Sequence, residues 1–118
     1  MPKCLLSPPW ITILCPACRE YVKQTYTDTD EAWWTNCGIH TLDLGDGKWS
    51  FDGNMDAPTI NPSIKAIRHY KDVEFVCHSY VRNGRIEYQG DSTHSLAGQS
   101  IELPDTSTWA HLIYGKEP

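Results

Sequence analysis

The sequence lacks any long apolar run. Nowhere in its 118 residues is there a stretch of the ~18 apolar residues that a membrane-spanning helix requires. The most apolar segment near the start is broken by Pro8 and Pro9, and no small-residue cleavage site follows it. Leu14 is too bulky to precede a lipid-modified cysteine. We therefore expect a cytoplasmic protein without a secretion signal or lipid anchor.

Clustered positive charge is also missing. The formal net charge is −5, from 10 Lys and Arg against 15 Asp and Glu. Binding to nucleic acid backbones needs grouped basic side chains that replace the counterions of the phosphates. Arg82 and Arg85 flank a turn and are typical of a solvated hairpin tip. We expect no nucleic-acid partner.

Helical periodicity is scarce, because eight prolines and eight glycines punctuate the chain. The pattern favours only a short helix over residues 29–34, with Asp30 and Glu31 in its first turn. No repeat or linker divides the chain, so residues 1–118 are predicted to form a single domain.

Alternating and β-branched segments, in contrast, are frequent. Single strands are expected over residues 10–14, 39–44, 48–51 and 99–103. Residues 73–89 predict a hairpin, because two alternating runs flank Asn83 and Gly84, which favour a type I′ turn. The turn sets a register in which Cys77 lies on the apolar face and His78 on the other. The predicted fold is mainly β, a small antiparallel β-meander with a zinc knuckle and little helix.

Five cysteines make an odd number, which suits a metal site better than a complete disulfide framework. Cys15 and Cys18, in a Cys-x-x-Cys spacing, form half of a zinc knuckle. Because the chain has no second Cys-x-x-Cys, we expect Cys77 and His78 to supply the other two ligands. A redox pair or metal-free buried cysteines are the alternative interpretations.

The fourth metal ligand is open at this point. Neighbouring residues of a regular strand face opposite sides, so Cys77 and His78 both ligate only at a bulge or strand end. In a regular strand, Cys77 ligates and His94 is the leading substitute for His78. A Cys-x-x-His clamp from Cys37 and His40 is a further alternative.

Residues 91–95 contain every residue type of a hydrolase triad, but triad members are normally brought together by the fold rather than by sequence proximity. The segment is equally typical of a turn. A zinc site with three cysteines and one histidine is closed, and closed sites are structural. We therefore expect a non-enzymatic protein, with a zinc-dependent hydrolase using His94 and Asp91 as the alternative.

Five tryptophans are many for this length. Trp33 and Trp34 stand beside acidic residues and form a candidate aromatic anchor for a protein partner, although core packing is the commoner role.

Four stretches together resemble a family of small proteins of tailed phages and prophages that genome annotations often label "ammonia monooxygenase". They are WSFDG (49–53), APTINPSI (57–64), CHSYVRNGRI (77–86) and DSTHSLAGQ (91–99). The chain is also similar to a domain found beside bacterial ubiquitin-like conjugation genes. The resemblance covers about residues 13–104.

The resemblance implies a zinc-binding β domain of phage origin, in a bacterial host cell. The monooxygenase label does not suit a chain without a membrane span. The residues after Cys18, Arg19-Glu20-Tyr21, depart from the glycine and histidine usual in the family's knuckle. Our functional expectation is a zinc-stabilised phage accessory protein that binds a host protein and modulates host processes or defence, in an oligomeric state that the sequence leaves open.

Overall fold

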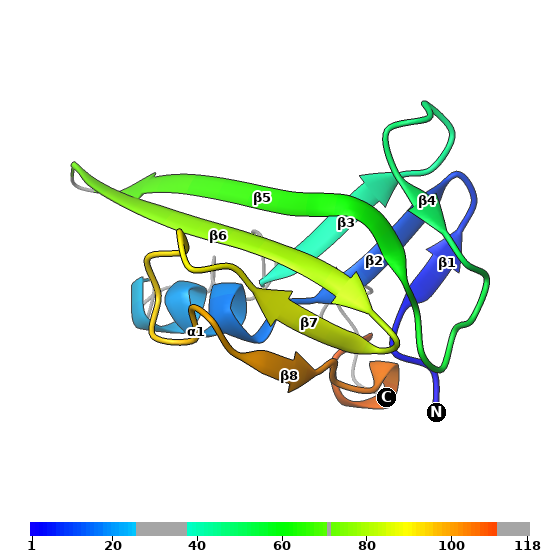
Figure 1. Ribbon diagram of the computed structural model, residues 1–118. Helices are drawn as coiled ribbons and strands as arrows, with labels where there is room; N and C mark the ends of the chain where they lie inside the picture. The colour runs from blue at the N-terminus through cyan, green and yellow to red at the C-terminus, as the bar shows by residue number, and fades with distance from the viewer. Residues whose placement is uncertain (26–37, 71, 111–118) are drawn as a thin grey trace.

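Two antiparallel sheets form the fold (Figure 1). The structure, a computed structural model, describes residues 1–25, 38–70 and 72–110. The first sheet contains β1 (Leu5–Ser7), β2 (Trp10–Leu14) and β3 (Ile39–Asp43). The second contains β4 (Ser50–Phe51), β5 (Ile60–Tyr70), β6 (Val73–Arg82), β7 (Arg85–Tyr88) and β8 (Ser100–Glu102). Strands follow each other in chain order in both sheets, so the predicted antiparallel, mainly β architecture is confirmed.

The β6–β7 hairpin has the predicted register. Val81 lies opposite Ile86 and Ser79 opposite Tyr88. Asn83 and Gly84 have φ angles of 51° and 77°, as a type I′ turn requires. The apolar face of β6 is consequently buried, and its polar face is directed outward.

Helix α1 (Pro16–Thr25) is a difference from the sequence-based prediction, which treated the segment as a tight turn. Pro16 stands at the first helical position, where a missing N–H has no cost. The helix predicted over residues 29–34 lies outside the described residues. Within the described ranges, no helix is both long and apolar enough to cross a membrane.

Two strands also separate the structure from the sequence-based prediction. Both β1 and the eleven-residue β5 were absent from it. Two prolines stand between β1 and β2, and Pro62 lies inside β5, so proline obscured both strands in the sequence pattern. A short 3-10 helix, Thr106–Thr108, follows β8.

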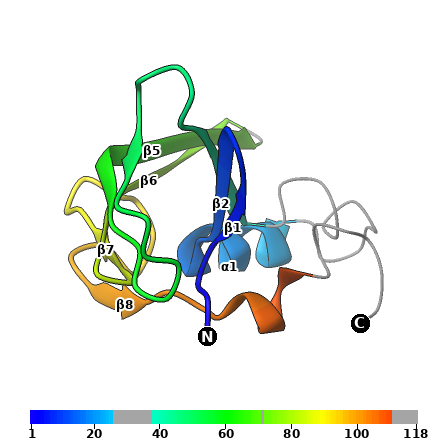
Figure 2. The ribbon, with the colours of Figure 1, turned by 90° about the vertical axis from the view of Figure 1, so that its right-hand side faces the viewer.

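The core lies between the two sheets and helix α1. Figure 2 shows α1 below the long β5–β6 hairpin, and the Tyr21 ring of α1 stacks on Phe75 of β6 at 4.2 Å. Ile11 and Ile13 of β2 belong to the same buried cluster as Val81 of β6. The inner face of β6 therefore meets both α1 and the first sheet, and this junction contains Cys15, Cys18 and Cys77.

Candidate functional site

Four buried side chains, Cys15, Cys18, His40 and Cys77, form one cluster at this junction. Their ligand atoms all lie within 4.8 Å of one another. The Sγ atoms of Cys15 and Cys77 are 3.6 Å apart, and Cys18 Sγ lies 3.7 Å from His40 Nε2. A tetrahedral zinc ion with metal–sulfur bonds of about 2.3 Å has sulfur–sulfur edges of about 3.8 Å. The spacing therefore fits a metal ion held by three thiolates and one imidazole.

The pKa shifts of the three thiols also favour a bound metal ion. Although burial opposes it, hydrogen bonds with Cys18 and Cys77 hold the pKa of the Cys15 thiol well below its usual range. Hydrogen bonding to Cys15 raises the pKa of Cys18 to about 12 and also raises the pKa of Cys77. The three thiols thus oppose one another's ionisation in the absence of a cation. A metal ion would allow all three to ligate as thiolates.

The ligands come from three separate elements, which are the start of α1, β3 and β6. Cys15 and Cys18 lie at the start of α1, where the Cys18 amide is 3.4 Å from Cys15 Sγ. His40 reaches the cluster because β3 pairs with β2, with His40 opposite Ile13. Gly38, at φ 82°, allows the backbone just before β3 to pass close to α1, since a Cβ there would lie 2.3 Å from the Cα of Arg19.

A hydroxyl supports the cluster from β7. Tyr88 Oη lies 3.2 Å from Cys15 Sγ and accepts a hydrogen bond of 3.1 Å from the Ala17 amide. Burial raises the pKa of the Tyr88 phenol, which keeps its proton available for the sulfur. Such outer contacts orient metal ligands.

The fourth ligand of the cluster is His40, and neither His78 nor His94 takes that place. His78 projects from the outer face of β6, because a regular strand sends it away from Cys77. The His94 ring packs edge-on against Tyr88 at 4.6 Å, and its Nδ1 accepts a hydrogen bond from the Leu96 amide. Cys37, the partner of His40 in the clamp considered from the sequence, lies outside the described residues, as do Trp33 and Trp34.

On the outer face of β6, His78 joins two other side chains in a second constellation. His78 Nε2 lies 3.0 Å from Ser63 Oγ. His78 Nδ1 lies 3.0 and 3.1 Å from the two carboxylate oxygens of Asp91. A hydroxyl on one imidazole nitrogen and a carboxylate on the other is the arrangement of a Ser-His-Asp catalytic triad.

An irregularity in β5 presents Ser63. Ile60 pairs with Val81 and Ile64 with Ser79, so β5 has two residues more than β6 between these pairs. Such bulges re-aim side chains and are common next to active sites. Here the bulge places Ser63 on the same face as His78, where its side chain is partly exposed. Ser63 is therefore not enclosed in the core.

The loop after β7 holds the third member in place. Ser92, next to Asp91, is 8% exposed, and its Oγ accepts a hydrogen bond from the His78 amide at 3.0 Å. The same hydroxyl donates to the His78 carbonyl at 3.1 Å. One loop thus fixes both the backbone of His78, through Ser92, and its ring, through Asp91.

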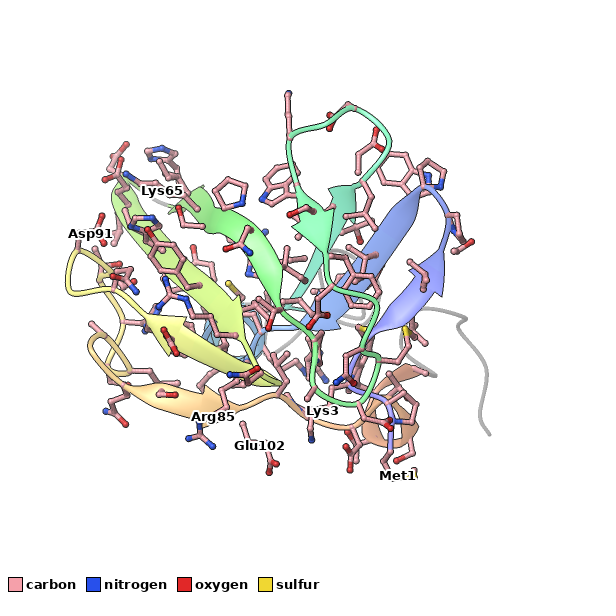
Figure 3. The ribbon with its side chains drawn as sticks, turned by 45° about the vertical axis from the view of Figure 1, so that its right-hand side comes forward. Met1, Lys3, Lys65, Arg85, Asp91 and Glu102 are labelled. Carbon is pink, nitrogen blue, oxygen red and sulfur yellow. The ribbon has the colours of Figure 1, made fainter. Side chains whose placement is uncertain are left out.

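Asp91 is kept in its charged form. The hydrogen bond from His78 lowers the pKa of its carboxyl group against the opposing effect of desolvation, and the electrostatic effects of His78 and Lys65 lower it further. Figure 3 shows Lys65 on β5 and Asp91 in the loop after β7, at the same end of the sheet. An ionised carboxylate is the form that orients a catalytic imidazole.

Sequence reasoning did not identify Ser63 as a functional residue. It carries no nucleophile motif of its own, and its only sequence signal is its position in the APTINPSI stretch of the resemblance. Asp91 was considered with His94, as a zinc-hydrolase pair, but the structure joins it to His78 and leaves both Asp91 and His94 out of the cysteine cluster.

Similarity to known proteins is found at the level of a family. A family model described as "Bacterial ubiquitination-like system serine protease (BubE)" matches residues 4–89. The matched segment contains Ser63 and His78, and Asp91 follows shortly after its end. No curated protein and no solved structure matches the chain. The family description is consistent with the expected relation to a domain beside ubiquitin-like conjugation genes. Because the match covers more than half of the 118 residues, the chain belongs to the BubE family.

Proposed function

We propose that the protein is a serine protease whose catalytic residues are Ser63, His78 and Asp91, and whose fold is held by a structural zinc ion. The observation that carries the proposal is the pair of contacts made by the His78 ring, to Ser63 Oγ at 3.0 Å and to Asp91 Oδ1 at 3.0 Å. The family description, which names a serine protease of a ubiquitination-like system, supports the same activity.

The geometry assigns a role to each group. Ser63 Oγ attacks the carbonyl carbon of the scissile bond while His78 Nε2 accepts its proton. The protonated imidazole then donates this proton to the leaving amine, and an acyl group remains on Ser63. Water, deprotonated by His78, releases the acyl group and restores the hydroxyl. Asp91 holds the Nδ1–H of the ring throughout and stabilises its positive charge.

The metal ion has a different role. Cys15, Cys18, Cys77 and His40 would fill all four positions of a tetrahedral zinc ion, which leaves no position for a reacting water. Zinc suits this ligand set because three soft thiolates and an imidazole select it over magnesium or calcium. We propose that zinc stabilises the junction of α1, β3 and β6 and takes no part in hydrolysis.

An enzymatic function replaces the non-enzymatic binding module that the sequence favoured. That interpretation rested on the closed metal site, but the triad lies on the opposite face of β6 and does not use the metal. We propose that the natural substrate of the enzyme is a polypeptide of a ubiquitination-like system, in line with the family description. Phage origin, a host protein partner and a cytoplasmic location stay predictions.

A fluorophosphonate reagent, which reacts with activated serines, tests the proposal. We expect it to modify the protein once, on Ser63, as mapped by peptide mass spectrometry. Ser63→Ala should abolish both the labelling and any hydrolysis of fluorescein-labelled casein, by roughly 10⁴- to 10⁶-fold. Ser107→Ala is the matched control, because Ser107 is exposed and distant from Ser63 in the sequence. This variant should retain both the labelling and the hydrolysis. Labelling that persists in Ser63→Ala would contradict the assignment.

A further inference from the structure

Strand β5 has an unpaired edge that begins beside the proposed nucleophile. Its partner β4 pairs only with Ile60 and Asn61, and among the described residues no other strand pairs with that side of β5. In Figure 1, β5 accordingly forms the upper boundary of its sheet beyond β4. The side chains of Lys65, Ile67 and His69 in this stretch are exposed, Ile67 at 50%.

Hydrogen bonds on the far side of β6 show which backbone groups point to this edge. The N–H and C=O of Val76 both bond to Thr93, and those of His78 bond to Ser92 and Gln89. Both residues therefore direct their backbone groups away from β5.

The partners of these two residues on β5 must then point outward as well. In an antiparallel pair, residues that do not bond each other both face away. Val76 lies opposite Ile67, and His78 lies opposite Lys65. Lys65, Ile67 and, by the same alternation, His69 direct N–H and C=O groups to the edge, where no strand of the described ranges bonds them.

We infer that this edge binds the substrate of the proposed protease as an added β-strand, so that the substrate is an extended polypeptide segment. The inference rests on the proposed function. A strand rises about 3.3 Å per residue, and Lys65 is two residues from Ser63. A peptide paired with Lys65 and Ile67 therefore continues past Ser63 within one or two residues, and the bulge at Ser63 ends the edge where the scissile bond would lie.

Backbone pairing of this kind recognises an extended chain largely without regard to its sequence. The edge suits a flexible tail or loop rather than a folded surface, because only an extended segment offers alternating donors and acceptors to it. A second copy of the chain is the competing occupant, since exposed edges also pair with each other.

A proline substitution at the edge tests the inference. Ile67→Pro removes an N–H that bonds nothing within the sheet and blocks strand addition. Ser100→Pro, in the strand at the opposite edge of the sheet, is the control away from the triad, although it also removes the hydroxyl that accepts a hydrogen bond from Arg85. We expect kcat/KM for labelled casein to fall about tenfold or more in Ile67→Pro, with a much smaller change in the rate of fluorophosphonate labelling, and to stay near the wild-type value in Ser100→Pro.

The outcomes separate the two proposals. Equal casein cleavage by the wild type and Ser63→Ala would overturn the proposed function and this inference together. Two outcomes would overturn the inference alone, provided that cleavage depends on Ser63. Casein cleavage could be unchanged in Ile67→Pro, or kcat/KM could fall in Ile67→Pro by no more than the rate of fluorophosphonate labelling falls.

Amide exchange provides a second measurement that does not depend on turnover. In the Ser63→Ala protein, we expect the amides of Lys65 and Ile67 to exchange freely and to become protected when casein peptides are added. Unchanged exchange would overturn the inference. Protection that instead rises with protein concentration, accompanied by a dimer in sedimentation, would also overturn it and assign the edge to a second copy.

Discussion

Cys77 and His78 are consecutive residues of β6, yet their side chains belong to two different sites on opposite faces of the sheet. Cys77 Sγ lies 3.6 Å from Cys15 Sγ inside the core, and His78 Nε2 lies 3.0 Å from Ser63 Oγ on the outer face. The alternation of a regular strand makes this division unavoidable. A Cys-His pair in a strand sequence is therefore poor evidence that both residues bind one metal.

Asp91→Asn is expected to reduce hydrolysis strongly while leaving the fold intact. The amide would orient the His78 ring in the wrong tautomer, so kcat should fall by about 10²- to 10⁴-fold with little change in KM. Steady-state kinetics with labelled casein measures the effect. Asp56→Asn, an exposed aspartate outside the triad, serves as the control. A wild-type kcat in Asp91→Asn would remove Asp91 from the proposed catalytic residues.

His40→Ala is expected to lose the metal and stability together. A structural zinc site contributes about 10–16 kcal/mol of apparent binding energy, so loss of one ligand should lower the free energy of unfolding by at least ~2 kcal/mol. Metal content by mass spectrometry and urea unfolding provide the measurements, and His40→Cys should restore zinc.

His78→Ala and His94→Ala are the companion variants for this ligand assignment. Both histidines lie outside the cysteine cluster, so both variants should keep one zinc per chain. Loss of zinc in either variant, with retention in His40→Ala, would overturn the ligand set.

Substitution by alanine should change the free energy of unfolding in opposite directions at two buried serines. Ser79 Oγ is fully buried and has no hydrogen-bond partner among the described residues, so Ser79→Ala should raise the free energy of unfolding by about 1 kcal/mol. Ser92 Oγ makes two hydrogen bonds to the backbone of His78, so Ser92→Ala should lower it by about 1–2 kcal/mol. Urea unfolding compares them, and equal effects would contradict this account.

Acid should destabilise the protein partly through His94. Burial lowers the pKa of His94 from its usual 6.5, against the opposing charge of Cys15, so the unfolded chain binds a proton more readily than the folded one. This contribution is present above pH 6.5 and is lost as the pH falls below it. The difference in melting temperature between pH 7.5 and pH 5 should therefore shrink in His94→Gln. Both proteins are compared at the same zinc concentration, because zinc binding also weakens in acid. An unchanged difference would contradict the prediction.

The sequence was sufficient for local features and insufficient for those that depend on pairing. Asn83 and Gly84 determine their own hairpin, and the spacing of Cys15 and Cys18 identifies a metal clamp. His40 joins the clamp only because β3 pairs with β2. No local pattern encodes that pairing partner.

The triad was even less accessible from sequence. Ser63, His78 and Asp91 come from a bulge, a strand and a loop, and none is a sequence neighbour of another. The stretch that seemed to contain a triad, residues 91–95, contributes only its first residue. Proximity in space comes here from the register of β5 against β6, which a proline inside β5 conceals.

The complete burial of Cys15, Cys18 and Cys77 has a practical consequence for chemical labelling. These three residues are shielded from solvent, whereas Ser63 is partly exposed. Thiol alkylators such as iodoacetamide should leave hydrolysis intact as long as the ion is retained, and serine-directed reagents should block it. These three thiols and the Ser63 side chain should therefore differ in their reactivity toward covalent reagents.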